Sequence, residues 1–69
     1  MLTIDARGHS CPEPVLLTKK ALASHPDQCT VLLDNIVAVE NVTRFAGYSH
    51  YRVERSGENG EFQLLLTRE

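Results

Sequence analysis

Hydrophobic and polar side chains alternate at both ends of the chain and recur with helical spacing in between. Residues 2–5 alternate in the way of a short strand, whereas residues 30–33 are almost wholly apolar, which is typical of a buried central strand. Residues 51–55 and 62–66 alternate again around a stretch rich in Gly and Asn. The pattern therefore predicts two separate strands followed by a β-hairpin whose loop spans residues 56–60.

Two segments between these strands have the spacing of amphipathic helices. The first covers residues 13–24, and Pro26 is expected to stop it. Its apolar face is expected from four residues: Val15, Leu16, Ala21 and Leu22. The second helix follows Asp34 or Asn35, either of which can cap its first turn, and Gly47 is expected to end it. Its apolar stripe is expected from five residues: Ala38, Val39, Val42, Phe45 and Ala46.

The predicted element order is β-α-β-α-β-β. Two amphipathic helices need one apolar face of a sheet to cover. We therefore expect an α+β fold, a two-layer α/β sandwich in which a four-stranded mixed sheet is covered on one face by two helices. The 69 residues suit one small domain, expected over residues 1–69. A domain of this size buries only about 60% of its unfolded surface, so any chemistry is expected near the surface.

Charge and hydropathy narrow the class of function. The net charge is −2, and Lys19-Lys20 is the only adjacent basic pair, which argues against a nucleic-acid-binding protein. No apolar run approaches the ~20 residues that cross a bilayer, and no signal peptide is recognisable. We therefore expect a cytoplasmic location and no membrane partner. The two cysteines and three histidines lack the spacing of zinc ligands, so no metal and no bound cofactor is expected.

The main candidate for chemistry is Cys11, which stands in the string GHSCPEP just before the first predicted helix. A helix N-terminus carries roughly half a positive elementary charge and favours a thiolate, the reactive form of cysteine. Pro14 suits the first helical turn, and Pro12 restricts the residue before it to an extended conformation. A free cysteine is more often a small buried hydrophobe. The flanking prolines and the polar Glu13 favour a reactive, exposed thiol instead.

These residues resemble the TusA/SirA-like sulfur-carrier family, which is marked by a Cys-Pro-x-Pro motif after a first strand. The resemblance rests on three segments: Asp5-Ala6-Arg7-Gly8, Cys11-Pro12-Glu13-Pro14-Val15-Leu16 and Thr18-Lys19-Lys20-Ala21-Leu22. A later group most resembles the YedF-type branch of the family: Val31-Leu32-Leu33-Asp34-Asn35, Glu40-Asn41-Val42 and Arg44-Phe45-Ala46. The resemblance implies a β-α-β-α-β-β sandwich and a cysteine that carries sulfur as a persulfide.

The resemblance also implies a role for Cys11 and for its neighbours. Cys11 would accept sulfur from a donor protein, such as a cysteine desulfurase, and pass it to an acceptor protein, with both partners bound transiently. Four residues would form and position the motif: Gly8, Pro12, Glu13 and Pro14. Three basic residues are candidates for docking a partner, with a solvated surface as the alternative: Arg7, Lys19 and Lys20.

Several alternatives stay open at this point. The chain is either a sulfurtransferase-like carrier, a selenium-metabolism protein of the YedF type, or a non-catalytic regulatory or interaction module. Whether it turns over as an enzyme or only carries sulfur is undecided, as is whether it stands alone or forms part of a longer protein. Cys29 either resolves a persulfide on Cys11 or, as we favour, packs at the start of the second strand. His9 either pairs with Cys11 or is an ordinary loop residue, which we favour.

Overall fold

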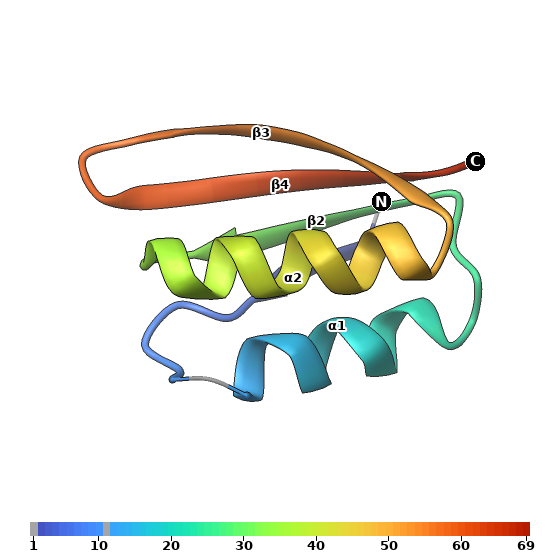
Figure 1. Ribbon diagram of the computed structural model, residues 1–69, viewed down its shortest axis with the longest axis horizontal. Coiled ribbons are helices and arrows are strands. Elements are labelled where there is room, and N and C mark those ends of the chain that lie inside the picture. Colours follow the sequence, from blue (N-terminus) through green and yellow to red (C-terminus); the bar gives the residue numbers. More distant parts are fainter. Residues whose placement is uncertain (1, 11) are drawn as a thin grey trace.

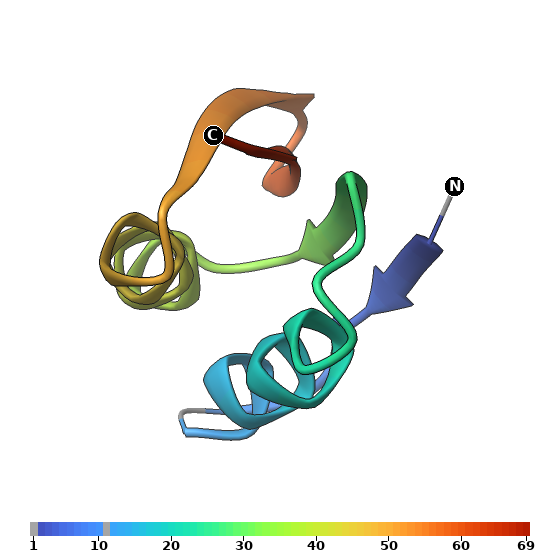
Figure 2. The same cartoon turned by 90° about the vertical axis from the view of Figure 1, so that its right-hand side faces the viewer.

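The computed structural model describes residues 2–10 and 12–69, and its elements follow the predicted order (Figure 1). The elements are β1 (Leu2–Asp5), α1 (Glu13–Leu22), β2 (Gln28–Leu33), α2 (Ile36–Tyr48), β3 (Tyr51–Glu58) and β4 (Glu61–Arg68). Both helices lie side by side on one face of the sheet, as the view along their axes shows (Figure 2). The expected two-layer α+β sandwich is confirmed.

The sheet is mixed, with the strand order β1-β2-β4-β3. Strand β1 pairs in parallel with β2, and the other two pairs are antiparallel. Parallel neighbours need a crossover connection, and α1 supplies it. Since β1 and β2 end at the same edge of the sheet, α1 and α2 both begin there, on the left in Figure 1. This edge therefore gathers the loop before α1 and the start of α2.

The core lies between the helices and the sheet. Its buried hydrophobic members come from both helices and from three strands: Leu22, Cys29, Val31, Leu33, Ala38, Val39, Val42, Ala46, Tyr51, Leu64 and Leu66, joined by Ala6 from the first loop. One buried polar residue, Thr18, donates its hydroxyl hydrogen bond to the Pro14 carbonyl at 2.8 Å. Because that bond satisfies the hydroxyl inside the helix, Thr18 packs in the core without an unpaired polar group.

Helix α1 buries the face that the sequence suggested except at Leu16: Leu22 is buried, and Val15 and Ala21 are partly buried against the core. Pro14, Thr18 and Leu22, spaced four residues apart, are buried, whereas Leu16 is 53% exposed. The expectation that Leu16 faces the core is wrong, because a residue two positions from Pro14 points about 200° away around the helix. The helix also ends at Leu22 and not at Ser24.

Helix α2 runs through Gly47 to Tyr48, so the expectation that Gly47 ends it is wrong. The left-handed residue that follows this helix is His50, with φ 66°, and its N–H donates to the Gly47 carbonyl at 3.2 Å. Histidine is among the residues that tolerate this conformation, so glycine is not required there. At the other end, Asn35 is the cap, since its side chain accepts a hydrogen bond from the Ala38 N–H at 2.8 Å.

The hairpin is tighter than predicted. Residues 56–58 belong to β3, and the turn consists of Asn59 and Gly60, with φ of 56° and 79°. Positive φ at both positions of a two-residue Asn-Gly turn is the requirement of type I′, whose twist matches that of the flanking strands. The loop predicted over residues 56–60 is therefore wrong, because the chain reverses within two residues. Strand β2 likewise begins at Gln28, two residues earlier than expected.

Glycine-to-alanine substitutions at two sites are expected to change stability in opposite directions. Gly57 has φ 139°, and a Cβ there would overlap the Glu61 carbonyl oxygen, so Gly57→Ala should lower the free energy of unfolding by more than about 1 kcal/mol. Gly47 lies in a helix with open space around it, so Gly47→Ala should raise that free energy by about 0.5 kcal/mol. Urea unfolding of both variants measures the difference. A neutral Gly57→Ala would contradict the strand assignment of residues 56–58.

Candidate functional site

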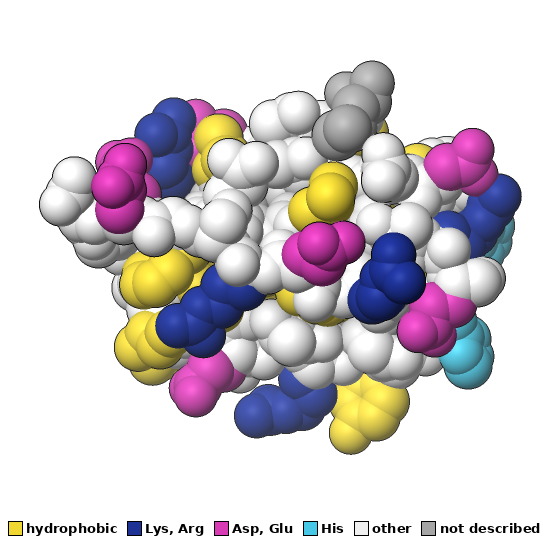
Figure 3. Space-filling view, turned by 90° about the horizontal axis from the view of Figure 1, so that it is seen from above, with side chains coloured by type: hydrophobic (Ala, Val, Ile, Leu, Met, Phe, Trp, Pro, Cys, Tyr) yellow, Lys and Arg dark blue, Asp and Glu magenta, His cyan; other side chains and the backbone are white. Residues whose placement is uncertain are grey.

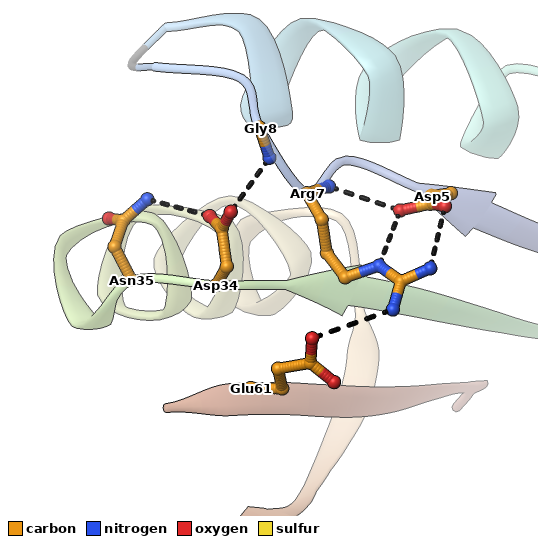
Figure 4. Close-up of polar contacts among 6 residues, drawn as sticks. All are labelled: Asp5, Arg7, Gly8, Asp34, Asn35 and Glu61. Carbon is orange, nitrogen blue, oxygen red and sulfur yellow. Dashed lines mark hydrogen bonds and ion pairs between the residues drawn. The ribbon is translucent and has the colours of Figure 1, made fainter. Parts of the chain in front are cut away.

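The loop over residues 6–10 joins β1 to α1 and is fastened to the end of β2. The buried Ala6 donates its N–H to the Leu32 carbonyl at 2.9 Å. Gly8 donates its N–H to the Asp34 carboxylate at 2.8 Å, across 26 positions of the sequence (Figure 4). The His9 N–H turns back to the Ala6 carbonyl at 3.4 Å. Backbone donors of this loop are thus bound to the protein itself, which fixes the path of the chain toward α1.

Gly8 permits this path because of its backbone conformation. Its φ is +80°, in the left-handed region that glycine adopts without a steric penalty. No atom lies within 4 Å of the position that a Cβ would take, so space alone does not demand glycine there. The positive φ of Gly8, and not steric crowding around it, therefore explains why glycine stands in this turn.

Arg7 is held in an ion-paired cluster on the sheet side of the loop (Figure 4). Its Nε and Nη2 donate to the two carboxylate oxygens of Asp5, each at 2.9 Å, and Glu61 lies 3.8 Å from Nη1. The hydrogen bonds from Arg7 lower the pKa of Asp5 to about 2, and Asp5 in turn raises the pKa of Arg7. Because the guanidinium already has two carboxylate partners, the three side chains together carry a net charge of −1 and the positive charge of Arg7 is compensated within the protein.

The two prolines of the motif do different things at the start of α1. Pro12 occupies the N-cap, is exposed, and accepts a hydrogen bond from the Leu16 N–H at 3.1 Å. Pro14 lies in the first turn and is buried, which anchors that turn in the core. Between them, Glu13 is exposed and donates its N–H to the Ser10 carbonyl at 2.9 Å. The chain on both sides of position 11 is therefore fixed, while Cys11 itself lies outside the described residues.

The basic residues predicted to dock a partner do not all lie at this site. Lys19 and Lys20 are exposed in the last turn of α1, with Lys19 roughly 9 Å along the helix axis from Glu13. Lys19 there lines a groove of about 400 Å³ together with His25 and His50. The motif residues gather at the opposite end of the helix, where His9 is exposed in the loop. A docking role for the lysines therefore stays a prediction about a separate part of the surface.

Charge on the sheet side is mixed as well. Seen from above in Figure 1, the molecule carries basic and acidic side chains interspersed over β3 and β4 (Figure 3). Arg52 and Glu54, both in β3, form an ion pair 4.0 Å apart. Neither helix of the described chain is long and apolar enough to cross a membrane.

Cys29 is fully buried at the start of β2, opposite Leu2 in the register. Burial raises the pKa of its thiol, because a thiolate is poorly solvated in the core. The start of β2 lies at the opposite edge of the sheet from the loop over residues 6–10. The expectation that Cys29 packs at the start of this strand is confirmed, and its burial argues against a reactive role.

Comparisons with known proteins agree with this geometry. The family model described as "Sulfurtransferase TusA" matches residues 2–68. The chain belongs to the TusA sulfurtransferase family. It is 36% identical over 69 residues to a protein of Methanocaldococcus jannaschii named "Putative sulfur carrier protein MJ0990", covering 96% of this chain and 92% of that protein. Its fold matches the crystal structure of a SirA-like protein from Desulfitobacterium hafniense over 100% of both chains, with a TM-score of 0.89 and 36% identity.

Membership of this family confirms the resemblance that the Cys-Pro-x-Pro motif indicated. A sulfur-carrier family implies transient partners that give and take sulfur. The structure adds a contact of Asp34 with the loop, whereas reasoning from the sequence considered this residue as a helix cap and as part of the resemblance to the YedF-type branch. Its bond to Gly8 links two segments 26 positions apart, and no local sequence pattern predicts such a contact.

The Asp5–Arg7 pair makes a testable prediction about pH. The pKa of Asp5 in the folded protein, about 2, lies below its ordinary value of 3.8. The pair therefore stabilises the fold fully above pH of about 4, and this contribution is lost as the pH falls toward 2. Since both side chains are exposed, solvent screening keeps the contribution small. NMR titration of the Asp5 carboxyl carbon in the native protein measures the lowered pKa.

Arg7→Gln is the informative variant, and Arg52→Gln is its control. Arg7→Gln should move the pKa of Asp5 back toward 3.8, because the side-chain hydrogen bond from Arg7 is the largest cause of the shift. Arg52→Gln removes an exposed arginine that pairs with Glu54, so it should leave Asp5 unchanged. An Asp5 that titrates near 3.8 in the native protein would contradict the ion pair.

Proposed function

We propose that this protein is a sulfur carrier that holds sulfur as a persulfide on Cys11, taking it from a donor such as a cysteine desulfurase and delivering it to an acceptor protein. The observation that carries the proposal is the fixed chain on both sides of this cysteine. Ser10 accepts the Glu13 N–H through its carbonyl, and Pro12 occupies the N-cap position of a helix whose first turn is anchored by the buried Pro14. Family membership supports the same role.

The transfer is a thiol exchange in which no external oxidant or reductant is used. The Cys11 thiolate attacks the terminal sulfur of the donor's cysteine persulfide. The donor's S–S bond breaks as a new S–S bond forms on Cys11, and the donor leaves as a thiolate. In the delivery step, Cys11 takes the place of the donor. A nucleophile of the acceptor attacks the terminal sulfur of the Cys11 persulfide, and Cys11 leaves as a thiolate. The exchange therefore involves no net oxidation or reduction of sulfur.

Each neighbour of Cys11 has a proposed part in this exchange. Helix α1 favours the thiolate, both as attacking group and as leaving group, because its N-terminus carries a partial positive charge. Pro12 and Pro14 stiffen the chain where the helix begins, and Gly8 supplies the left-handed turn of the preceding loop. Glu13 is exposed in the first turn, where a carboxylate suits the helix dipole.

The proposal is tested by loading the protein with sulfur. Reduced protein is mixed with a cysteine desulfurase and cysteine, and intact mass and peptide mapping follow the product. We expect one added sulfur atom on Cys11, removed by a thiol reductant and absent in Cys11→Ser. The loaded protein should then transfer this sulfur to the thiol of a second protein.

Cys29→Ala serves as the matched control, since it removes the other thiol of the chain. Because Cys29 is buried and its thiol pKa is raised, the variant should load sulfur as the native protein does while losing about 1–3 kcal/mol of stability from the core. Native protein that stays unloaded, with Cys11 still open to alkylation, would overturn the carrier proposal. Loading on Cys29 would overturn the assignment of the site.

A further inference from the structure

The loop that leads to Cys11 is tied by a residue from a distant part of the chain. Asp34 follows directly after β2, and one of its carboxylate oxygens accepts the Gly8 N–H at 2.8 Å (Figure 4). We propose that Asp34 is a positioning residue, which through this bond fixes the loop over residues 6–10 and thereby the orientation in which Cys11 is presented. The proposal rests on the proposed function and adds to it a residue that acts through the loop.

Asp34 is free for this task because its neighbour caps the helix. The Asn35 side chain accepts the Ala38 N–H at 2.8 Å and holds the start of α2. Its amide nitrogen lies 3.5 Å from the second carboxylate oxygen of Asp34. The carboxylate thus sits between loop and helix, close to a helix N-terminus, where a negative charge is stabilised. Each carboxylate oxygen of Asp34 has a partner, and these two contacts orient the carboxylate toward the Gly8 N–H.

Among residues 2–10 and 12–69, the bond from Gly8 to Asp34 is the last one along the chain that joins this loop to the β2–α2 junction before α1 begins. Ala6 is bound earlier, through the Leu32 carbonyl. Arg7 turns its side chain to Asp5 and Glu61. The remaining backbone bonds of the loop, from His9 and to Ser10, are local. Without Asp34, the described backbone of the loop after Ala6 would keep, besides the side-chain ion pair of Arg7 with Glu61, only such local bonds.

A positioning role and a purely electrostatic role of Asp34 have opposite consequences. If Asp34 acted on Cys11 through its charge, it would disfavour the thiolate, and removing the charge alone would lower the pKa of Cys11 and speed its reactions at neutral pH. Loss of the tether instead leaves the reactive group less well aligned for transfer between two proteins, and misalignment slows such reactions. The direction of the rate change therefore distinguishes the two roles.

Two substitutions at Asp34 separate the bond from the charge. Asp34→Ala removes both, and Asp34→Asn removes the charge but keeps an oxygen that accepts the Gly8 N–H. We expect Asp34→Ala to slow sulfur loading from the desulfurase by about tenfold and Asp34→Asn to stay within about threefold of the native rate. Glu54→Gln, on a strand away from the loop, controls for the loss of one negative charge.

Two readouts do not depend on sulfur transfer. The NMR amide signals of Gly8, His9 and Glu13 should shift or broaden in Asp34→Ala and stay close to native in Asp34→Asn. The pH midpoint of Cys11 alkylation by iodoacetamide should be the same in native protein and in Asp34→Asn, because the carboxylate acts through position. These readouts keep the test valid even where the native protein takes up no sulfur, an outcome that would contradict the proposed function alone.

Three outcomes would overturn the inference. If the tether matters, Asp34→Ala loads sulfur more slowly than the native protein, so an unchanged loading rate would overturn the inference. A lowered alkylation midpoint in both variants, with faster loading, would make Asp34 an electrostatic residue. Unchanged amide signals of the loop in Asp34→Ala would show that the bond to Gly8 does not hold it. Urea unfolding of each variant confirms that the measurements refer to folded protein.

Discussion

The parallel pairing of β1 with β2 is the constraint on which the rest of the structure depends. Two parallel neighbours end at the same edge of the sheet, and their connection must return through a helix. That geometry brings the loop after β1 and the residues after β2 together, although they are far apart in sequence. The bond between Gly8 and Asp34 is possible only because of this arrangement. An antiparallel pair would have placed these two segments at opposite edges.

Once the two strand ends are neighbours, a small protein can hold an exposed site without enclosing it. The loop over residues 6–10 has few apolar side chains to bury, with Ala6 as its buried anchor. Hydrogen bonds from its backbone and the packing of Pro14 take the place of a pocket. Ordering each residue of such a loop costs about 1–2 kcal/mol of conformational entropy, and proline and local hydrogen bonds reduce or offset that cost.

Reasoning from the sequence was most accurate where the structure is local and periodic. The strands and helices followed from alternation and helical spacing, and the motif around Pro12 and Pro14 pointed to the start of α1. It was wrong where another residue holds a conformation that glycine usually adopts. After α2, the left-handed residue is His50 and not Gly47. It also missed Asp34, because the partner of that side chain is set by strand pairing and not by neighbours in the chain.

A carrier that serves two partners places a particular demand on this edge of the fold. Donor and acceptor must both reach the same sulfur, so the group cannot lie deep in a cleft shaped for only one of them. A loop whose described residues are already held by hydrogen bonds suits both encounters, because each then spends less free energy on ordering the loop. The buried thiol of Cys29 shows the contrasting environment, where desolvation keeps the sulfur protonated. The fold thus keeps the cysteine used for packing at the opposite edge of the sheet from the loop that leads to the proposed carrier cysteine.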